Sequence, residues 1–269
     1  MRIEKFAVQS LNKIKDQSPL IHNITNFVVM NSTANILLAI GASPVMAHSL
    51  EEVEEMTALA NALVLNIGTL QPDWLEAMIV AAKTANKLNI PVILDPVGAG
   101  ATKFRTHAVQ TIMQESRITV LRGNASEVLS IGSTAIRTRG VDSTLTISNG
   151  MIDTVRQMAL DYQCTIAMSG AVDFITDGQR IFRVKNGHPL MGRVTGVGCG
   201  LTAVTGAFCA VSDADPVINV SAAAAFYGLC GELAAQTSKQ PGSFYMSFID
   251  QLYATGEAEI EEFIKVEEC

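Results

Sequence analysis

Residues 62–95 read ALVLNIGTLQPDWLEAMIVAAKTANKLNIPVILD, and this stretch predicts a strand, a helix and a second strand. The runs 62–67 and 91–94 are almost wholly apolar and are bounded by turn residues, which is typical of buried parallel strands. Between them, apolar side chains recur at helical spacing over residues 73–89. Because parallel strands joined by helices build a doubly wound sheet, the stretch predicts an α/β fold.

The same alternation continues on both sides of this stretch. The apolar runs 118–121 and 165–168 predict two more strands, and the turn at Asp177-Gly178 predicts a hairpin. Ser49 followed by Glu52 predicts a helix that opens with a capping box. No linker or repeat divides the chain, so we expect one domain over residues 1–269 with a central, mostly parallel sheet flanked by helices on both faces.

The composition of the chain indicates which binding partners and which cellular compartment to expect. The chain has 269 residues, a formal net charge of -7 and a pI of about 5.1, which argues against nucleic acid as a partner. The apolar run 221–230 consists of small residues and predicts a buried helix rather than a membrane span. The five cysteines are an odd number without Cys-x-x-Cys spacing, and residues 1–16 lack the apolar core of a secretory signal. We therefore expect a cytoplasmic protein.

A glycine-rich turn, Thr195-Gly196-Val197-Gly198-Cys199-Gly200, precedes a predicted buried helix. Such a turn can aim backbone N–H groups at one point, and the helix N-terminus adds partial positive charge, so the turn could hold a phosphoryl group. It could equally be a close-packed turn that needs glycine for geometry alone. The chain has no Gly-Lys dipeptide, which excludes a Walker A loop, and its G-x-G pairs lack the third glycine of a dinucleotide site.

Cys199 stands where this helix begins. A helix N-terminus lowers the pKa of a thiol, so Cys199 is a candidate base for the proton of an alcohol. The alternative is that Cys199 only fills space, because free cysteines are commonly buried.

Three side chains at strand ends could hold magnesium. In open α/β sheets, ligands bind beyond the carboxyl ends of the strands. Asp95 ends one predicted strand, and Asn124 and Glu127 follow another with the three-residue spacing that points both the same way. The alternatives are a helix start with Asn124 as N-cap and Glu127 completing a capping box, and ordinary turn chemistry for Asp95 before proline.

Taken together, eight blocks in this order resemble the hydroxyethylthiazole kinase family of the ribokinase-like superfamily over nearly the whole chain. The blocks are His22-Asn23-Ile24-Thr25-Asn26, Gly41-Ala42-Ser43-Pro44-Val45-Met46, Asn66-Ile67-Gly68-Thr69, Asp95-Pro96-Val97-Gly98-Ala99-Gly100-Ala101-Thr102, Arg122-Gly123-Asn124-Ala125-Ser126-Glu127, Gly140-Val141-Asp142-Ser143, Thr195-Gly196-Val197-Gly198-Cys199 and Pro241-Gly242-Ser243-Phe244.

The resemblance implies transfer of the γ-phosphoryl of ATP, with Mg2+, to the hydroxyl of 5-(2-hydroxyethyl)-4-methylthiazole. It implies a homotrimer with the thiazole pocket between subunits. The implied residues fall into four groups: Met46, Asn26, Gly68 and Gly196 at the thiazole, Arg122 and Ser169 at ATP, Asp95, Asn124 and Glu127 at magnesium, and Gly196, Gly198 and Cys199 at the transferred phosphate. Most relatives in the superfamily have Asp at the position of Cys199, although similar thiazole kinases also have Cys.

Three other functions fit parts of the pattern. A sister kinase would phosphorylate a different alcohol, such as hydroxymethylpyrimidine. A dehydratase that repairs hydrated nicotinamide nucleotides shares glycine-rich loops, but an aspartate is expected at its anion-binding turn. A regulatory subunit would bind the nucleotide without turnover, and it would not need Arg122, Asn124, Glu127 and Cys199 together.

Overall fold

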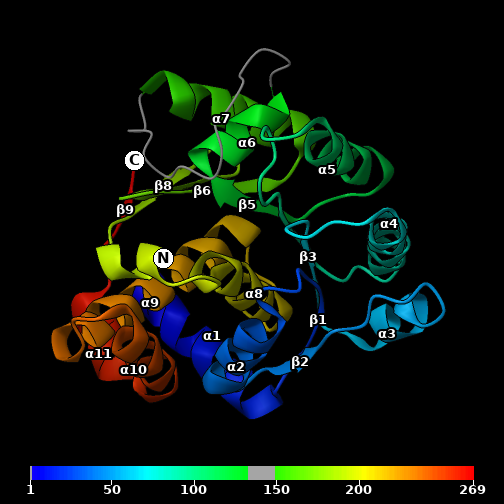
Figure 1. Cartoon of the computed structure of the whole chain (residues 1–269). Coiled ribbons are helices and arrows are strands. Elements are labelled where there is room, and N and C mark those ends of the chain that lie inside the picture. The colour runs from blue at the N-terminus through cyan, green and yellow to red at the C-terminus, as the bar shows by residue number, and fades with distance from the viewer. Residues whose placement is uncertain (1, 133–148) are drawn as a thin grey trace.

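The computed structural model describes residues 2–132 and 149–269, and within these ranges one nine-stranded sheet lies between two groups of helices (Figure 1). The strands lie side by side in the order β2-β1-β3-β4-β5-β6-β7-β8-β9. Their bounds are β1 (Leu20–Ile24), β2 (Ser43–Val45), β3 (Ala62–Asn66), β4 (Val92–Asp95), β5 (Val120–Asn124), β6 (Thr165–Ser169), β7 (Asp173–Thr176), β8 (Ile181–Val184) and β9 (Val266–Glu268).

The strands from β2 to β6 pair in parallel, and β7, β8 and β9 extend that sheet in antiparallel fashion. This confirms the predicted mostly parallel sheet and the hairpin at Asp177-Gly178. The register places Asn66 beside Asp95, and Asn124 beside Ser169. The polar ends of neighbouring strands therefore lie at one edge of the sheet.

Each face of the sheet is covered by its own helices (Figure 1). One face packs against α1 (Ile3–Gln17), α2 (Met30–Ile40), α8 (Val197–Ala210), α9 (Pro216–Thr237), α10 (Pro241–Ala254) and α11 (Glu257–Phe263), with the 3-10 helix η1 (Pro189–Arg193) beside them. The other face packs against α3 (Val53–Leu59), α4 (Pro72–Lys87), α5 (Lys103–Glu115), α6 (Ala125–Gly132) and α7 (Asn149–Tyr162).

Strand β3 shows why these runs are apolar throughout. Val64 packs into the hydrophobic cluster of the first face, whereas Leu63 and Leu65 pack into the cluster of the second. Successive side chains of a strand point to opposite faces, so a sheet covered on both sides needs apolar residues at every position.

Helix α9 contains the apolar run 221–230 and lies in the core of the first face. By length and composition alone it could cross a membrane, yet 89% of its most apolar window is buried inside the described structure. Small side chains such as Ala222 to Ala225 let it pack closely against α8 and α10. The prediction of a buried core helix is confirmed.

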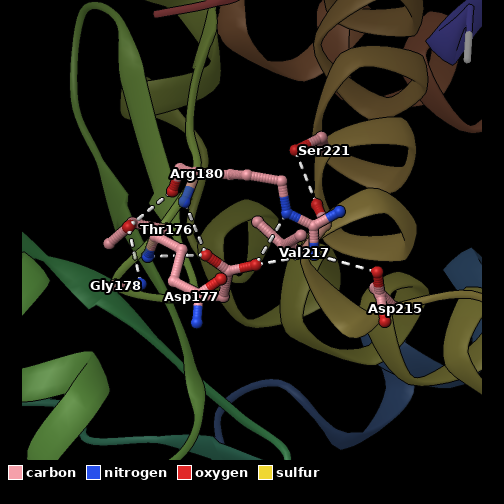
Figure 2. A network of polar contacts seen from close by, with 8 residues as sticks. Thr176, Asp177, Gly178, Arg180, Asp215, Val217 and Ser221 are labelled. Atoms are coloured by element: carbon pink, nitrogen blue, oxygen red, sulfur yellow. Dashed lines mark hydrogen bonds and ion pairs between the residues drawn. The ribbon is translucent and has the colours of Figure 1, made fainter.

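An ion-pair network ties the β7–β8 hairpin to the start of α9 (Figure 2). Arg180 Nη2 lies 2.6 Å from Asp177 Oδ2 in the turn and 2.9 Å from Asp215 Oδ2, just before α9. These groups are partly exposed, so the network contributes little stability and mainly fixes the position of the hairpin.

The structure differs from the sequence prediction at the start of α3, and it does not describe one of the sequence blocks. The helix predicted to open at Ser49 begins instead at Val53, because Ser49 Oγ accepts a hydrogen bond from Glu51 N, not from Glu52 N, and residues 50–52 form a turn. The block Gly140-Val141-Asp142-Ser143 lies outside the described residues.

Candidate functional site

Polar side chains from five strand ends meet the first turns of α8 at the carboxyl edge of the sheet. They come from β1 or the loop after it, β3, β4, β5 and β6, and hydrogen bonds link them into one cluster that also includes the first turns of α8. A surface hollow of about 640 Å3 lies at the opposite edge of the sheet and contains none of these side chains.

Gly196 is the N-cap of α8 and has φ of 86°, a left-handed conformation that favours glycine. A Cβ atom there would lie 2.8 Å from Ser32 Oγ. The backbone hydrogen bonds of α8 begin with the Gly200 N–H, which donates to the Gly196 carbonyl at 2.8 Å. The three N–H groups before it, those of residues 197–199, therefore have no partner within the helix and can face an anion.

The first turn of α8 is held from behind by α9. The hydroxyl of Tyr227, which is fully buried, donates to the Val197 carbonyl at 2.8 Å. Gly200 lets the helices approach, because a Cβ atom there would lie 2.5 Å from the Tyr227 oxygen and 2.4 Å from Ile36. The turn thus has both of the features that sequence suggested: it is closely packed, and it presents free N–H groups.

Arg122 reaches across from β5 to the turn. Its Nη1 donates to the Gly198 carbonyl at 3.0 Å, and its Nη2 donates to Ser169 Oγ on β6 at 2.8 Å. Its Nε is buried and has no hydrogen-bond partner within the described structure. The site therefore brings together Gly196, Gly198, Arg122 and Ser169, and it sets one fixed cation beside the free N–H groups.

Asp95 is buried at the centre of the cluster, with 1% of its surface exposed. Asn66 Nδ2 on β3 and Thr202 Oγ1 on α8 both donate to its Oδ2, at 2.9 Å and 2.7 Å. Burial raises the pKa of the Asp95 carboxyl to about 6; Arg122 opposes this, and the Glu127 carboxylate adds to it. Asp95 therefore joins β4 to β3 and α8 and is more than a turn residue before proline.

Asn124 and Glu127 form the capping box that was the alternative to a metal site. The Glu127 N–H donates to Asn124 Oδ1 and the Asn124 N–H donates to Glu127 Oε2, both at 2.9 Å. Glu127 Oε1 also accepts from the Gly98 N–H at 2.8 Å. Both carboxylate oxygens are thus engaged by backbone, although the negative charge of Glu127 still acts on Asp95.

Cys199 is partly buried in the first turn of α8, and Asn26 Nδ2 approaches its Sγ at 3.7 Å. Burial and, to a lesser degree, the Asp95 carboxylate raise the pKa of the thiol to about 12, although hydrogen bonds with Asn66 and Asn26 and the positive charge of Arg122 oppose the change. The expected lowering of this pKa by the helix N-terminus is therefore wrong for the protein alone. Desolvation and a neighbouring carboxylate outweigh the helix end.

Of the residues expected at the thiazole, some lie within the cluster and one lies at its edge. Gly68 lies against Asn26, because a Cβ atom on Gly68 would come 2.6 Å from Asn26 Nδ2. Met46 follows the edge strand β2, one strand beyond β1, and is partly buried. The structure thus joins Gly68 and Asn26 to the cluster, and it leaves Met46 at its outer rim.

Three linking residues were not singled out from sequence: Asn66, Thr202 and Arg105. Arg105 Nη1 donates to the Val97 carbonyl at 2.7 Å, and Nη2 donates to the Gly68 carbonyl, which fixes two loops of the site together. Asn66 could have been found, because it is the one polar residue in an otherwise apolar run at a strand's carboxyl end. Arg105 carries no such signal.

Within residues 2–132 and 149–269, no group of three or more His, Cys, Asp or Glu side chains could hold a metal ion unaided. Both hydrogen bonds that reach the Asp95 carboxylate in this part of the chain end on Oδ2, which leaves Oδ1 for a further partner. Magnesium is usually bound by one or two carboxylates with water and substrate phosphates. The donors present fit a magnesium ion that arrives with a nucleotide.

Comparisons with a family model, with known sequences and with solved structures point to the same family. Residues 11–257 match the family described as Hydroxyethylthiazole kinase family. The chain is 50% identical over 262 residues to the hydroxyethylthiazole kinase of Desulfotalea psychrophila, covering 97% of this chain and 95% of that protein. The solved structure of hydroxyethylthiazole kinase from Pyrococcus horikoshii is 44% identical and superposes with a TM-score of 0.90 over 98% of this chain and 99% of that one.

A more distant structure shares the fold alone. The pyridoxal kinase of Staphylococcus aureus, solved in complex with AMP-PCP and pyridoxal, is 15% identical and has a TM-score of 0.61 over 93% of this chain and 98% of that one. Together with the Pyrococcus structure, it confirms the ribokinase-like α/β architecture predicted from the sequence.

Proposed function

This chain belongs to the hydroxyethylthiazole kinase family, whose members phosphorylate the hydroxyl of hydroxyethylthiazole, and we propose that the transfer takes place at the first turn of α8. The observation that carries this proposal is the turn itself: three backbone N–H groups without helical partners lie beside the Arg122 guanidinium, within a cluster that contains Asp95 and Cys199. The kinase activity of the family implies ATP as the phosphoryl donor.

The turn would stabilise the phosphoryl group as it moves. Phosphoryl transfer passes through a loose transition state whose negative charge is spread over the equatorial oxygens, so catalysis depends on positioning and on charge stabilisation. The N–H groups of residues 197–199 and the partial positive charge of the helix end supply both. Gly196 and Gly198 add no side chain of their own to the turn.

Arg122 and Ser169 would bind the phosphates of ATP. Arg122 is already held by the Gly198 carbonyl and Ser169 Oγ, so its positive charge is fixed next to the turn before the nucleotide arrives. A fixed cation costs less ordering free energy on binding than a mobile one.

Asp95 would hold Mg2+ through the oxygen that Asn66 and Thr202 leave free, and Glu127 and Asn124 would act on the ion's water shell. A bound magnesium ion would neutralise charge on the phosphates of the nucleotide. The raised pKa of Asp95 supports this assignment, because a buried carboxylate beside a second carboxylate gains from a cation.

Cys199 would contact the hydroxyl of the thiazole. In the transfer, the alcohol oxygen forms a bond to the γ-phosphorus, the bond from that phosphorus to the bridging oxygen of ADP breaks, and the hydroxyl proton would pass to the Cys199 thiolate, which forms when the thiol first gives its own proton to water. With a thiol pKa of about 12 in the protein alone, Cys199 is protonated at neutral pH and first serves to orient the alcohol. The Asn26 N–H that approaches Sγ would stabilise a thiolate as the proton moves.

The thiazole pocket would be completed by another copy of the chain in a homotrimer. Phe27 and Val28, which directly follow Asn26, are 56% and 64% exposed although both are apolar. A neighbouring subunit would cover them and bring its own residues, including Met46 or Asn26, to the thiazole. Such a subunit contact would place the substrate pocket at the interface.

We also infer that residues 1–269 form one domain that works in the cytoplasm. Both hydrophobic clusters share a single sheet, and all five cysteines are free thiols. Free thiols suit a reducing compartment.

The test is an assay of ADP release that depends on hydroxyethylthiazole, run with and without Mg2+ and with hydroxymethylpyrimidine as the competing alcohol. We expect turnover with the thiazole alone and only when magnesium is present. Cys199→Asp should stay active, because a carboxylate is already a base at neutral pH, whereas Cys199→Ser should fall substantially. Equal rates for the three proteins would remove the proton-accepting role of Cys199.

A further inference from the structure

Asn66 joins the two halves of the candidate site through one side-chain amide. It ends β3, and 2% of its surface is exposed. Its Nδ2 donates to Asp95 Oδ2 at 2.9 Å, and its Oδ1 accepts from Asn26 Nδ2 at 2.8 Å. Asn26 in turn approaches Cys199 Sγ, so a continuous chain of contacts runs from the carboxylate to the thiol.

The direction of this amide is determined by its neighbours. The backbone N–H of Gly68 donates to Asn66 Oδ1 at 3.0 Å, and a backbone N–H can only donate. The oxygen of the amide must therefore face Gly68 and Asn26, which leaves the NH2 group for Asp95. The amide of asparagine offers an acceptor on one side and a donor on the other without a change of protonation.

We propose that Asn66 is a positioning residue for phosphoryl transfer, which holds the Asp95 carboxylate with Nδ2 while it holds Asn26, and through Asn26 the thiol of Cys199, with Oδ1. This inference rests on the proposed roles of Asp95 and Cys199. The residue touches neither substrate nor metal itself. It fixes the distance between the group that faces the cation and the group that faces the alcohol.

Thr202 supports the same arrangement from α8. It lies three residues after Cys199 in the helix, and its hydroxyl donates to the oxygen of Asp95 that Asn66 also contacts. The carboxylate is thus held from β3 and from α8 at once. Residues that orient a metal ligand typically change metal affinity or activity by about 10- to 100-fold when they are replaced.

Two substitutions separate the two ends of the amide. Asn66→Asp keeps the acceptor for Gly68 and Asn26 but loses the donor to Asp95, so we expect kcat to fall about 10- to 100-fold while KM for hydroxyethylthiazole stays within about twofold. Asn66→Ala loses both ends, so kcat should fall and KM for the thiazole should rise. Electron paramagnetic resonance of Mn2+ with ADP should show about tenfold weaker Mn2+ binding to Asn66→Ala, which releases the Asp95 carboxylate without adding a charge, and this readout is independent of turnover.

Asn86→Asp is the matched control. Asn86 also bridges with both ends of its amide, donating to the Arg117 carbonyl at 2.8 Å and accepting from the Arg117 N–H at 2.7 Å, but it lies at the opposite edge of the sheet. Its replacement should leave kcat and Mn2+ binding unchanged. Thermal unfolding of all variants measures the folded fraction, to which the rates are normalised.

The outcomes distinguish this inference from the proposed site. Asp95→Asn and Cys199→Ser are assayed in parallel, and wild-type activity in both would refute the site itself. Loss of activity in those two with normal kcat and Mn2+ binding in both Asn66 variants would overturn the role of Asn66 alone. If neither Asn66 variant folds, or if both lose stability without any change in rate per folded molecule, Asn66 is a structural residue and the proposal is wrong.

Discussion

Replacing Gly196 by alanine tests whether the turn before α8 must keep its shape for catalysis. The added Cβ would lie 2.8 Å from Ser32 Oγ and 3.3 Å from Val29 Cγ1. Because a comfortable contact needs roughly 3.5 Å, the turn or Ser32 must move by roughly 0.7 Å. The left-handed φ adds strain of about 1–2 kcal/mol, and the crowding adds about 1–3 kcal/mol.

Gly196→Ala should therefore lower the free energy of unfolding by about 2–5 kcal/mol. A shift approaching 1 Å of groups that hold the reacting phosphate costs on the order of 100-fold in rate, so we expect kcat to fall by about 10- to 100-fold. The measurements are denaturant unfolding and steady-state ADP release with hydroxyethylthiazole, at a temperature where the variant remains folded.

Two other glycines in the segment before α8 provide controls. Gly192→Ala meets nothing within 4 Å and has no left-handed strain, so both stability and kcat should stay near wild type. Gly187→Ala also meets nothing within 4 Å but has φ of 145°, so it should lose stability without losing kcat. If Gly196→Ala loses stability as expected but keeps kcat within twofold, the turn does not act on the phosphate.

Three further predictions follow from the same cluster. The pKa of Asp95 is about 6 in the folded protein and 3.8 in the unfolded chain, so its stabilising contribution is full below pH 3.8 and is lost as the pH rises through 6. Without metal, Asp95→Asn should therefore be more stable than wild type by at most about 3 kcal/mol at pH 7.5, and the two proteins should be equally stable below pH 4. Urea unfolding in EDTA measures this difference. An unchanged stability difference across that pH range would contradict the raised pKa. Arg122→Lys cannot make both hydrogen bonds of the guanidinium group, to the Gly198 carbonyl and to Ser169 Oγ, so KM for ATP should rise at least tenfold. A KM within twofold of wild type would refute the role of this guanidinium group in ATP binding. Tyr227→Phe removes the buried hydroxyl that donates to the Val197 carbonyl, so the free energy of unfolding should fall by about 1–3 kcal/mol, as measured by thermal unfolding. An unchanged free energy of unfolding would contradict the burial of this hydrogen bond.

Most of the fold could be predicted from the sequence because its signals are local. The run 62–67 and the helical spacing over residues 73–89 appear in the structure as β3 and α4, with bounds that differ by one or two residues. The predicted start of α3 was wrong because Ser49 and Glu52 have the spacing of a capping box, whereas the serine hydroxyl accepts a hydrogen bond from the N–H of Glu51. A pattern of residue types does not determine which N–H a side chain selects.

The candidate site could be predicted in outline only. Strand ends and the glycine-rich turn pointed to the correct edge of the sheet, because that edge follows from parallel connectivity. The pKa of Cys199 could not be predicted, since it depends on burial and on Asp95, which is 104 positions away in the chain. Asn66 could have been suspected as the polar end of an apolar run, but its contact with Asp95, like that of Thr202, forms only after three separate elements have packed together.

A crystal structure of the protein with a non-hydrolysable ATP analogue, magnesium and hydroxyethylthiazole tests the central claim most directly. We predict that oxygens of the terminal phosphate lie within hydrogen-bonding distance of the backbone N–H groups of residues 197–199, and that the thiazole hydroxyl lies next to Cys199 Sγ. A terminal phosphate bound away from Gly198, with the hydroxyl directed at another side chain, would contradict the account.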